Sequence, residues 1–141
     1  MSKPHLGPQF HERALGIIQG NDGWIKGNDA RTIFRAANIR SWPMRESPSM
    51  TGRDFGLEEE GGIHPDEVLN TAQGHLHGPT LRKYMTEGAP EMDPAYEDRK
   101  YLPEVLTSAR GRKWIDEGHH RIVASRLRGD RGTDVYEGYL M

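Results

Sequence analysis

Asp116-Glu117-Gly118-His119-His120-Arg121 occupies a turn between a predicted strand and a predicted helix. The strand is indicated by residues 113–115, and the helix by apolar residues that recur at helical spacing over residues 122–128. The first amides of a helix have no partners within the helix, and its N-terminus carries about half a positive charge. The sequence therefore predicts a site for a phosphate or carboxylate at this junction.

Four residues of this segment have the chemistry to bind phosphate. Gly118 has no side chain to keep an anion from the helix amides, and Arg121 presents a planar fork of donors. His119 and His120 add donors whose charge changes near neutral pH. If the helix begins at about His119, His120 shares its apolar face, so we expect His119 to contact the ligand and His120 to orient the loop. The alternative is a glycine turn before an amphipathic helix with solvated histidines.

Asp116, Glu117 and His119 are the candidate catalytic residues. A carboxylate beside a bound phosphate can hold Mg²⁺ or act as a base toward water or a hydroxyl group. Carboxylates at such turns also cap helices, which is the structural alternative for Asp116. Two carboxylates are too few for a two-metal site, so the sequence does not complete a set of metal ligands.

Residues 115–124 resemble the phosphate box of the ParB/sulfiredoxin superfamily, in which Asp-Gly-His-His-Arg precedes a helix of small residues. Thr80–Gly88 resembles the short helix of that family that ends in glycine, and Leu102–Leu106 resembles the strand that follows it. The resemblance covers about residues 63–140. It implies a small α/β (α+β) domain with a small mixed sheet, which binds a nucleotide such as ATP or CTP, with or without Mg²⁺, through residues 118–121.

Two departures from the family pattern narrow the expected activity. Sulfiredoxin-type members carry a catalytic cysteine at the position of His119, and this chain contains no cysteine. Classical partitioning members have Glu-Arg-Arg in the box and a DNA-binding helical domain after it, whereas the box here reads His-His-Arg. The resemblance therefore implies a ParB-like nuclease or NTPase, with DNA retained as an alternative partner.

Composition predicts a single domain with a modest core. The 141 residues include 17 glycines and 9 prolines, and only 34% are hydrophobic. The net charge of −2 argues against a protein that coats nucleic acid, although residues 110–131 contain seven Lys or Arg against three Asp or Glu. No apolar run approaches the roughly 20 residues of a membrane span, and the start lacks a secretory signal. We expect a cytoplasmic protein without a membrane partner.

The chain divides at about residue 62. Residues 1–62 are predicted to form an N-terminal helical extension and a loop, and residues 63–141 the box-bearing region of the same compact domain.

His75 and His77 lie two apart in an extended segment, which is a weak metal signal, and we assign no metal ligand. Helices are predicted over residues 8–19, 29–38 (capped by Asn28), 65–74 and 79–87, and strands over residues 105–108, 113–115 and 135–140.

A second hypothesis belongs to a different class of protein. The extension lies outside the resemblance and is followed by a loop, Trp42–Phe55, that contains Met44 and Met50. A phage- or plasmid-type interaction protein without enzymatic activity could retain the fold and use this surface to bind a host protein. Packing of the loop against its own domain is the structural alternative.

Overall fold

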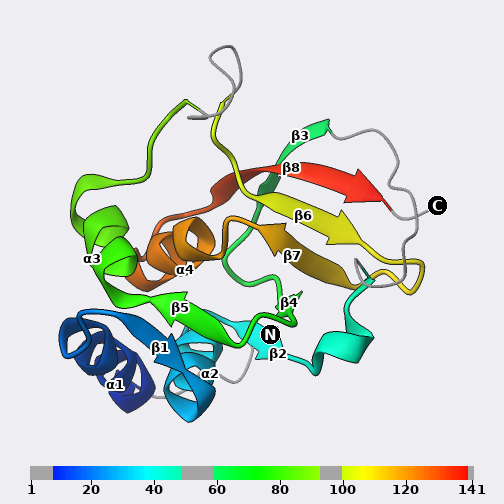
Figure 1. Cartoon of the computed structure of the whole chain (residues 1–141). Helices are drawn as coiled ribbons and strands as arrows, with labels where there is room; N and C mark the ends of the chain where they lie inside the picture. The colour runs from blue at the N-terminus through cyan, green and yellow to red at the C-terminus, as the bar shows by residue number, and fades with distance from the viewer. Residues whose placement is uncertain (1–7, 49–58, 93–99, 140–141) are drawn as a thin grey trace.

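The computed structural model describes residues 8–48, 59–92 and 100–139 (Figure 1). Its elements are, in chain order, α1 (Pro8–Gln19), β1 (Trp24–Lys26), α2 (Gly27–Ala36), β2 (Ile39–Ser41), the 3₁₀ turn η1 (Met44–Glu46), β3 (Glu59–Ile63), β4 (Leu69–Thr71), β5 (His75–His77), α3 (Gly78–Glu87), β6 (Glu104–Thr107), β7 (Lys113–Glu117), α4 (His119–Arg128) and β8 (Thr133–Tyr139). A six-stranded sheet has the order β2-β4-β7-β6-β8-β3, and β1 pairs with β5 in a second sheet. The fold is α+β, as expected.

The six-stranded sheet is mixed. Strand β4 lies between β2 and β7 and is parallel to both, whereas β6 and β7 form an antiparallel hairpin. The hairpin confirms the prediction from residues 105–108 and 113–115, and its turn uses Gly111 at a φ of +81°. Strand β8 is parallel to β6 and antiparallel to β3. The predicted closing strand is therefore also present, over residues 133–139.

The first sixty residues contribute strands as well as helices. Strand β1 is antiparallel to β5, β2 is parallel to β4, and β3 is antiparallel to β8. Each of these three pairs joins the N-terminal part of the chain to the part that carries the box. The segment expected as a helical extension and loop is thus built into both sheets.

Four of the predicted helices are present, α4 among them, and α2 shows a local difference. Helices α1 and α3 match their predicted ranges, and α2 begins two residues earlier than expected. The N-cap position of α2 is Lys26, so Asn28 does not cap the helix as predicted. The Asn28 Oδ1 atom instead accepts a hydrogen bond of 2.5 Å from the Arg31 side chain one turn later.

The helix predicted over residues 65–74 is wrong, because residues 69–71 form strand β4. Leu69 and Thr71 have no exposed surface, and the strand is flanked by β2 and β7. Acidic residues before an apolar pair suggested the first turn of a helix. The Glu67 carboxylate instead accepts hydrogen bonds from the His64 amide, at 2.9 Å, and the Lys113 ammonium, at 2.7 Å, and so closes a turn before the strand.

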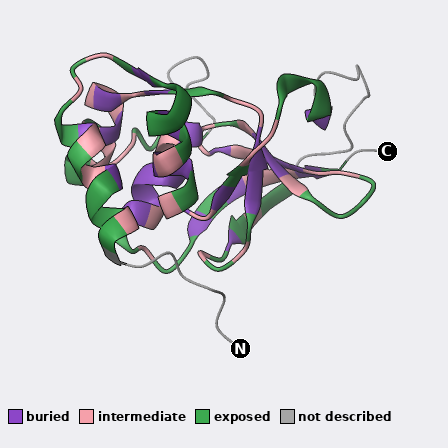
Figure 2. Ribbon diagram, turned by 90° about the horizontal axis from the view of Figure 1, so that it is seen from below, coloured by how far each residue is buried: buried purple, intermediate pink, exposed green. Residues whose placement is uncertain are grey.

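The hydrophobic core is formed by residues of the helices and of both sheets, and Figure 2 colours the buried residues of these elements purple. Helix α4 contributes apolar residues at core-facing positions and packs against α3. The fully or almost fully buried core residues include Ile18, Ile25, Ile33, Phe34, Leu69, Leu76, Leu81, Val105, Ile122, Val123 and Val135. Helix α4 is therefore held along its length, and the junction with β7 is fixed in place.

Candidate functional site at the junction of β7 and α4

The turn between β7 and α4 requires glycine at position 118. Gly118 has a φ of +88°, in the left-handed region, and it immediately precedes the first residue of α4. A Cβ atom at this position would lie 2.6 Å from both Cα and Cβ of Pro103. Both the backbone conformation and the close approach of Pro103 therefore exclude a larger residue.

The N-terminus of α4 keeps its first amides outside the helical hydrogen-bond ladder. The first intrahelical bond at this end runs from the Ile122 amide to the Gly118 carbonyl, at 3.1 Å. Gly118, at the N-cap position, has no side chain with which to cap the helix. The amides of residues 119–121 thus supply donors and partial positive charge at the turn.

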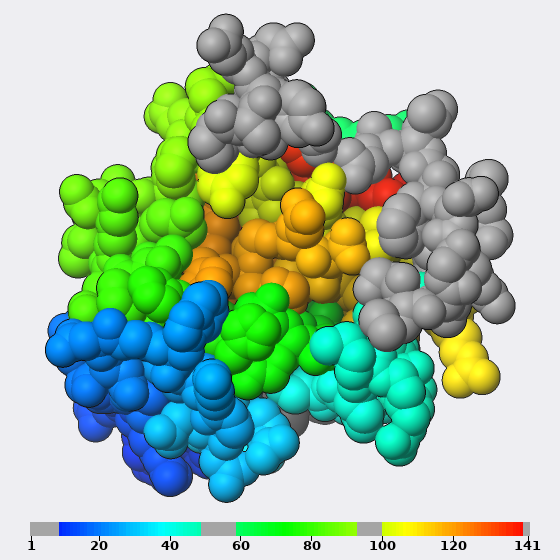
Figure 3. Space-filling view, in the orientation of Figure 1, coloured from blue at the N-terminus to red at the C-terminus, as the bar shows by residue number. Residues whose placement is uncertain are grey.

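A pocket of about 300 Å³ opens at this helix start. Residues 116–121 form one wall, and the residues across from them include Gln73, Tyr84, Tyr101 and Pro103. Figure 3 shows β7 and α4, in orange, at the surface in the middle of one face of the molecule, bordered by the green residues of α3 and β5. The volume is at the lower end of the range for small-molecule sites, large enough for the phosphate groups of a nucleotide.

Part of the Arg121 guanidinium group is already hydrogen-bonded within the protein. Its Nη1 atom donates hydrogen bonds to the carbonyl oxygens of Pro90, at 2.9 Å, and Tyr101, at 2.5 Å. These bonds fix the guanidinium plane at the rim of the pocket. Its Nε and Nη2 donors have no partner among the described residues, so the remaining side of the fork is available to an anion.

His119, not His120 as the sequence suggested, is the more deeply buried histidine of the pair, with 7% of its surface exposed, although it also lines the pocket. It is the first residue of α4 and shares the core-facing side of the helix with Ile122 and Val123. Its Nε2 atom lies 2.6 Å from the Thr71 hydroxyl, and its ring meets Phe34 edge-on at 6.0 Å between centroids. Burial lowers the pKa of His119 to about 3.

His120 ties the same helix turn to strand β5. The backbone amide of His77 donates a hydrogen bond of 2.8 Å to the His120 Nε2 atom, which must therefore carry a lone pair. Burial, with a smaller contribution from His77, lowers the pKa of His120 to about 4. Both histidines of the box are thus neutral near pH 7, and neither supplies a full positive charge to a phosphate.

Asp116 and Glu117 end strand β7 and line the same pocket. Glu117 is exposed, whereas Asp116 is half-buried and already interacts with a neighbouring group. The described residues contain no group of three histidine or acidic side chains arranged to hold a metal ion. A Mg²⁺ ion at this site would therefore need phosphate oxygens and water to complete its ligands.

Several residues of the pocket carried no signal in the sequence. Gln73, Tyr84 and Pro103 reach the site because β4, α3 and the segment before β6 converge on the start of α4. Burial raises the pKa of Tyr84, and Tyr101 beside it raises it further, so the Tyr84 phenol stays neutral. The sequence suggested that Gly118 leaves room for an anion, whereas the position of its absent Cβ lies against Pro103.

The His75 and His77 rings lie against a tryptophan. Their centroids are 5.2 Å and 4.9 Å from that of Trp24 on the neighbouring strand β1. The His77 Nδ1 atom is also 2.7 Å from the Thr80 hydroxyl. These contacts give both rings a packing role in the two-stranded sheet.

Comparisons of the chain with protein-family models, with curated proteins and with solved structures found no match. The inferences about function below therefore start from the geometry of the pocket. Within the described ranges, no helix combines the length and the apolar character needed to cross a membrane.

Proposed function

We propose that the junction of β7 and α4 binds the phosphate groups of a nucleotide such as ATP or CTP. The observation that carries this proposal is the start of α4 behind Gly118, which opens into a pocket with Arg121 at its rim. Phosphate oxygens would accept hydrogen bonds from the amides of residues 119–121 and from the free side of the Arg121 fork. This is the role that a resemblance to the ParB/sulfiredoxin phosphate box implies for residues 118–121.

The charges at the site favour a nucleotide bound with Mg²⁺. Asp116 and Glu117 place two carboxylates beside one guanidinium and the partial positive charge of the helix. The two carboxylates would repel a polyphosphate alone, and a Mg²⁺ ion held by Asp116 and Glu117 would offset that repulsion. The ion would also stabilise charge that develops on the phosphates during hydrolysis.

Hydrolysis of a phosphoanhydride or phosphodiester bond is the activity that follows from this arrangement. The exposed carboxylate of Glu117 is the group with access to water, and it would accept a proton from the attacking molecule. Asp116 would help to hold Mg²⁺. His119, which is buried against Thr71, would position the helix start rather than transfer a proton.

Isothermal titration with ATP, CTP, GTP and ADP, each with and without Mg²⁺, tests the proposal. We expect at least one nucleotide to bind, and to bind more tightly with Mg²⁺. Arg121→Ala should weaken this binding by roughly 10- to 150-fold, because it removes a charge-assisted hydrogen bond. Arg110→Ala, an exposed residue in the β6–β7 turn, is the matched control and should bind as the parent does. Absence of heat for every nucleotide with a folded protein would refute the proposal.

The alternative, a phage- or plasmid-type protein that binds a host protein, has less support. Trp42 is used internally: its Nε1–H donates to the Asn70 side chain at 2.8 Å, and its ring lies 6.0 Å from that of Trp114. Met44 is 56% exposed, whereas Met50 and Phe55 lie outside the described residues. Because one exposed methionine does not define an interface, we propose the nucleotide site in preference.

A further inference from the structure

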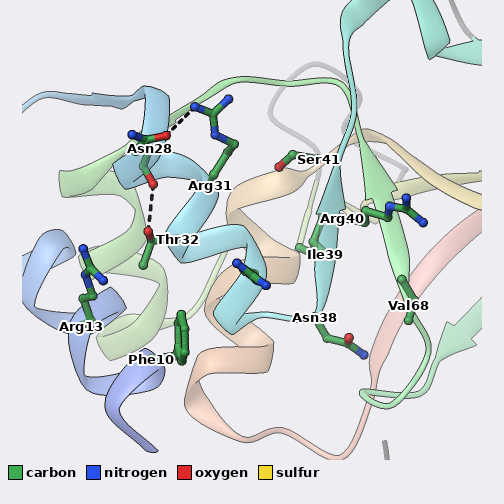
Figure 4. Close-up of a pocket in the computed structure, with 11 residues that line it drawn as sticks. Phe10, Arg13, Asn28, Arg31, Thr32, Asn38, Ile39, Arg40, Ser41 and Val68 are labelled. Carbon is green, nitrogen blue, oxygen red and sulfur yellow. Dashed lines mark hydrogen bonds between the residues drawn. The ribbon is translucent and has the colours of Figure 1, made fainter. Parts of the chain in front are cut away.

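A second concave surface is formed mainly by the N-terminal part of the chain, far in sequence from the phosphate box. It is a groove of about 710 Å³ between α1, α2 and β2, which we call the arginine groove and define by Phe10, Arg13, Arg31, Arg35 and Arg40. Figure 4 shows side chains from all three elements around it, with Phe10 and Arg13 on α1 and Arg31 on α2. None of these residues belongs to the nucleotide pocket.

The groove concentrates positive charge without compensation. Its four arginines are all exposed, and no acidic residue in the described ranges lines it. None of the four forms an ion pair with a described carboxylate, and Arg31 is oriented by its bond to Asn28. Because the whole chain has a net charge of −2, this local excess does not simply follow from composition.

Aromatic rings alternate with the guanidinium groups. Arg35 lies over the Phe10 ring at 5.8 Å from its centroid. At the β2 end of the groove, Arg40 lies over the Trp42 ring at 4.2 Å from its centroid, and Arg112, from outside the groove, lies over the same ring at 4.7 Å. The rings therefore hold exposed guanidinium groups flat against them at the protein surface.

We propose that the arginine groove binds single-stranded nucleic acid. Four guanidinium groups on three elements suit a chain of successive phosphates better than one isolated anion. The guanidinium planes of Arg35 and Arg40, held over the Phe10 and Trp42 rings, favour unpaired bases, which can stack on such planes, over an acidic peptide, which would use the charges alone. Asn28 and Thr32 add uncharged hydrogen-bonding groups to the groove.

Fluorescence anisotropy of a labelled oligodeoxythymidine, titrated with the full chain at several salt concentrations, tests this inference. If four phosphates are neutralised, the logarithm of the association constant should fall with the logarithm of salt with a slope of about −3. Arg13→Ala/Arg35→Ala should weaken binding by about 25-fold at 0.1 M salt and make the slope shallower by roughly 1.4. Phe10→Leu should weaken binding by about fivefold or more.

The matched control is Lys83→Ala/Arg131→Ala, which removes the same charge from exposed positions outside the groove. We expect this variant to bind the oligonucleotide as the parent does. Equal losses in both double variants would overturn the proposal in favour of unspecific attraction to net charge. Tighter binding of polyglutamate than of the oligonucleotide would assign the groove to an acidic protein, and no binding of the oligonucleotide would also refute the proposal.

Discussion

Gly118 shows how a single residue can set the geometry of the proposed site. Two separate effects oppose a side chain there, the left-handed φ of +88° and the contact with Pro103. Gly111, in the β6–β7 turn, has a similar φ of +81° but open space around its Cα atom. The two glycines therefore allow backbone strain and steric contact to be measured separately.

Gly118→Ala should destabilise the protein by about 2–4 kcal/mol, and Gly111→Ala by about 1 kcal/mol. The first change adds a clash with Pro103 to the strain that both share. Urea unfolding monitored by tryptophan fluorescence measures the two free energies of unfolding. Equal losses in the two variants would show that Pro103 can move away and that the turn is less constrained than its geometry indicates.

The buried histidines predict a particular dependence of stability on pH. The pKa values of His119 and His120 are lowered to about 3 and about 4, so both remain neutral in the folded state while they take up protons in the unfolded state below about pH 6.5. Stability is thus fully present above that pH and falls as the pH decreases. The loss should approach about 1.4 kcal/mol per pH unit for each histidine.

Free energies of unfolding measured from pH 7.5 to pH 5 test this expectation, in a range above the titration of the ion-paired carboxylates. His119→Gln keeps a partner for the Thr71 hydroxyl but cannot be protonated, so it should remove about half of the slope. A slope unchanged by this substitution would mean that His119 is not held neutral inside the protein.

Among the elements, α4 is tied to the N-terminal part of the chain by Arg126. Its Nη1 atom donates to the carbonyls of Ala37, at 3.1 Å, and Asn38, at 3.2 Å, and its Nη2 atom donates to that of His64 at 3.1 Å. Asn38 adopts a φ of +59°, which turns the chain out of α2 toward β2. Burial lowers the pKa of Arg126 to about 10, so it stays charged at neutral pH.

Arg126→Met should destabilise the protein by about 2–3 kcal/mol, because it leaves two partly buried carbonyl groups and one exposed carbonyl group without this donor while keeping most of the apolar volume. Arg110→Ala, in an exposed turn, should change stability by less than about 0.5 kcal/mol. Thermal and urea unfolding provide both values. A loss below 1 kcal/mol for Arg126→Met would show that water satisfies these carbonyls equally well.

Local patterns predicted several elements and failed where long-range pairing decides the structure. The β6–β7 hairpin and helices α1, α3 and α4 follow from glycine turns and helical spacing close in sequence. Strand β4 was mistaken for a helix, because only its place between β2 and β7 makes three consecutive residues buried. Residues 69–71 show no alternation of apolar and polar side chains long enough to predict a strand.

The same distinction applies to the candidate site. Residues 116–121 do line one pocket, a proximity that their adjacency in sequence already made probable. Which histidine turns inward depends on Thr71 and Phe34, and these reach the helix start only through the tertiary fold. The arginine groove was missed for this reason too, since its residues come from three elements that showed no common pattern.

At the scale of the whole molecule, the N-terminal part cannot be separated from the box-bearing part without removing strands. Strands β1, β2 and β3 each pair with a strand from beyond residue 63. Deleting residues 1–55 would remove β1 and β2, so it would not test the host-protein alternative alone. Met44→Glu, which changes one exposed side chain, is the more selective variant for that hypothesis.

The central claim is that phosphate binds to the amides at the start of α4. Amide chemical shifts recorded by NMR during titration with a nucleotide and Mg²⁺ test it most directly, because each amide reports separately. We predict the largest changes at residues 118–121, and changes at the same amides when inorganic polyphosphate replaces the nucleotide. Largest changes around Arg13, Arg35 and Arg40, or none at residues 118–121, would contradict the claim.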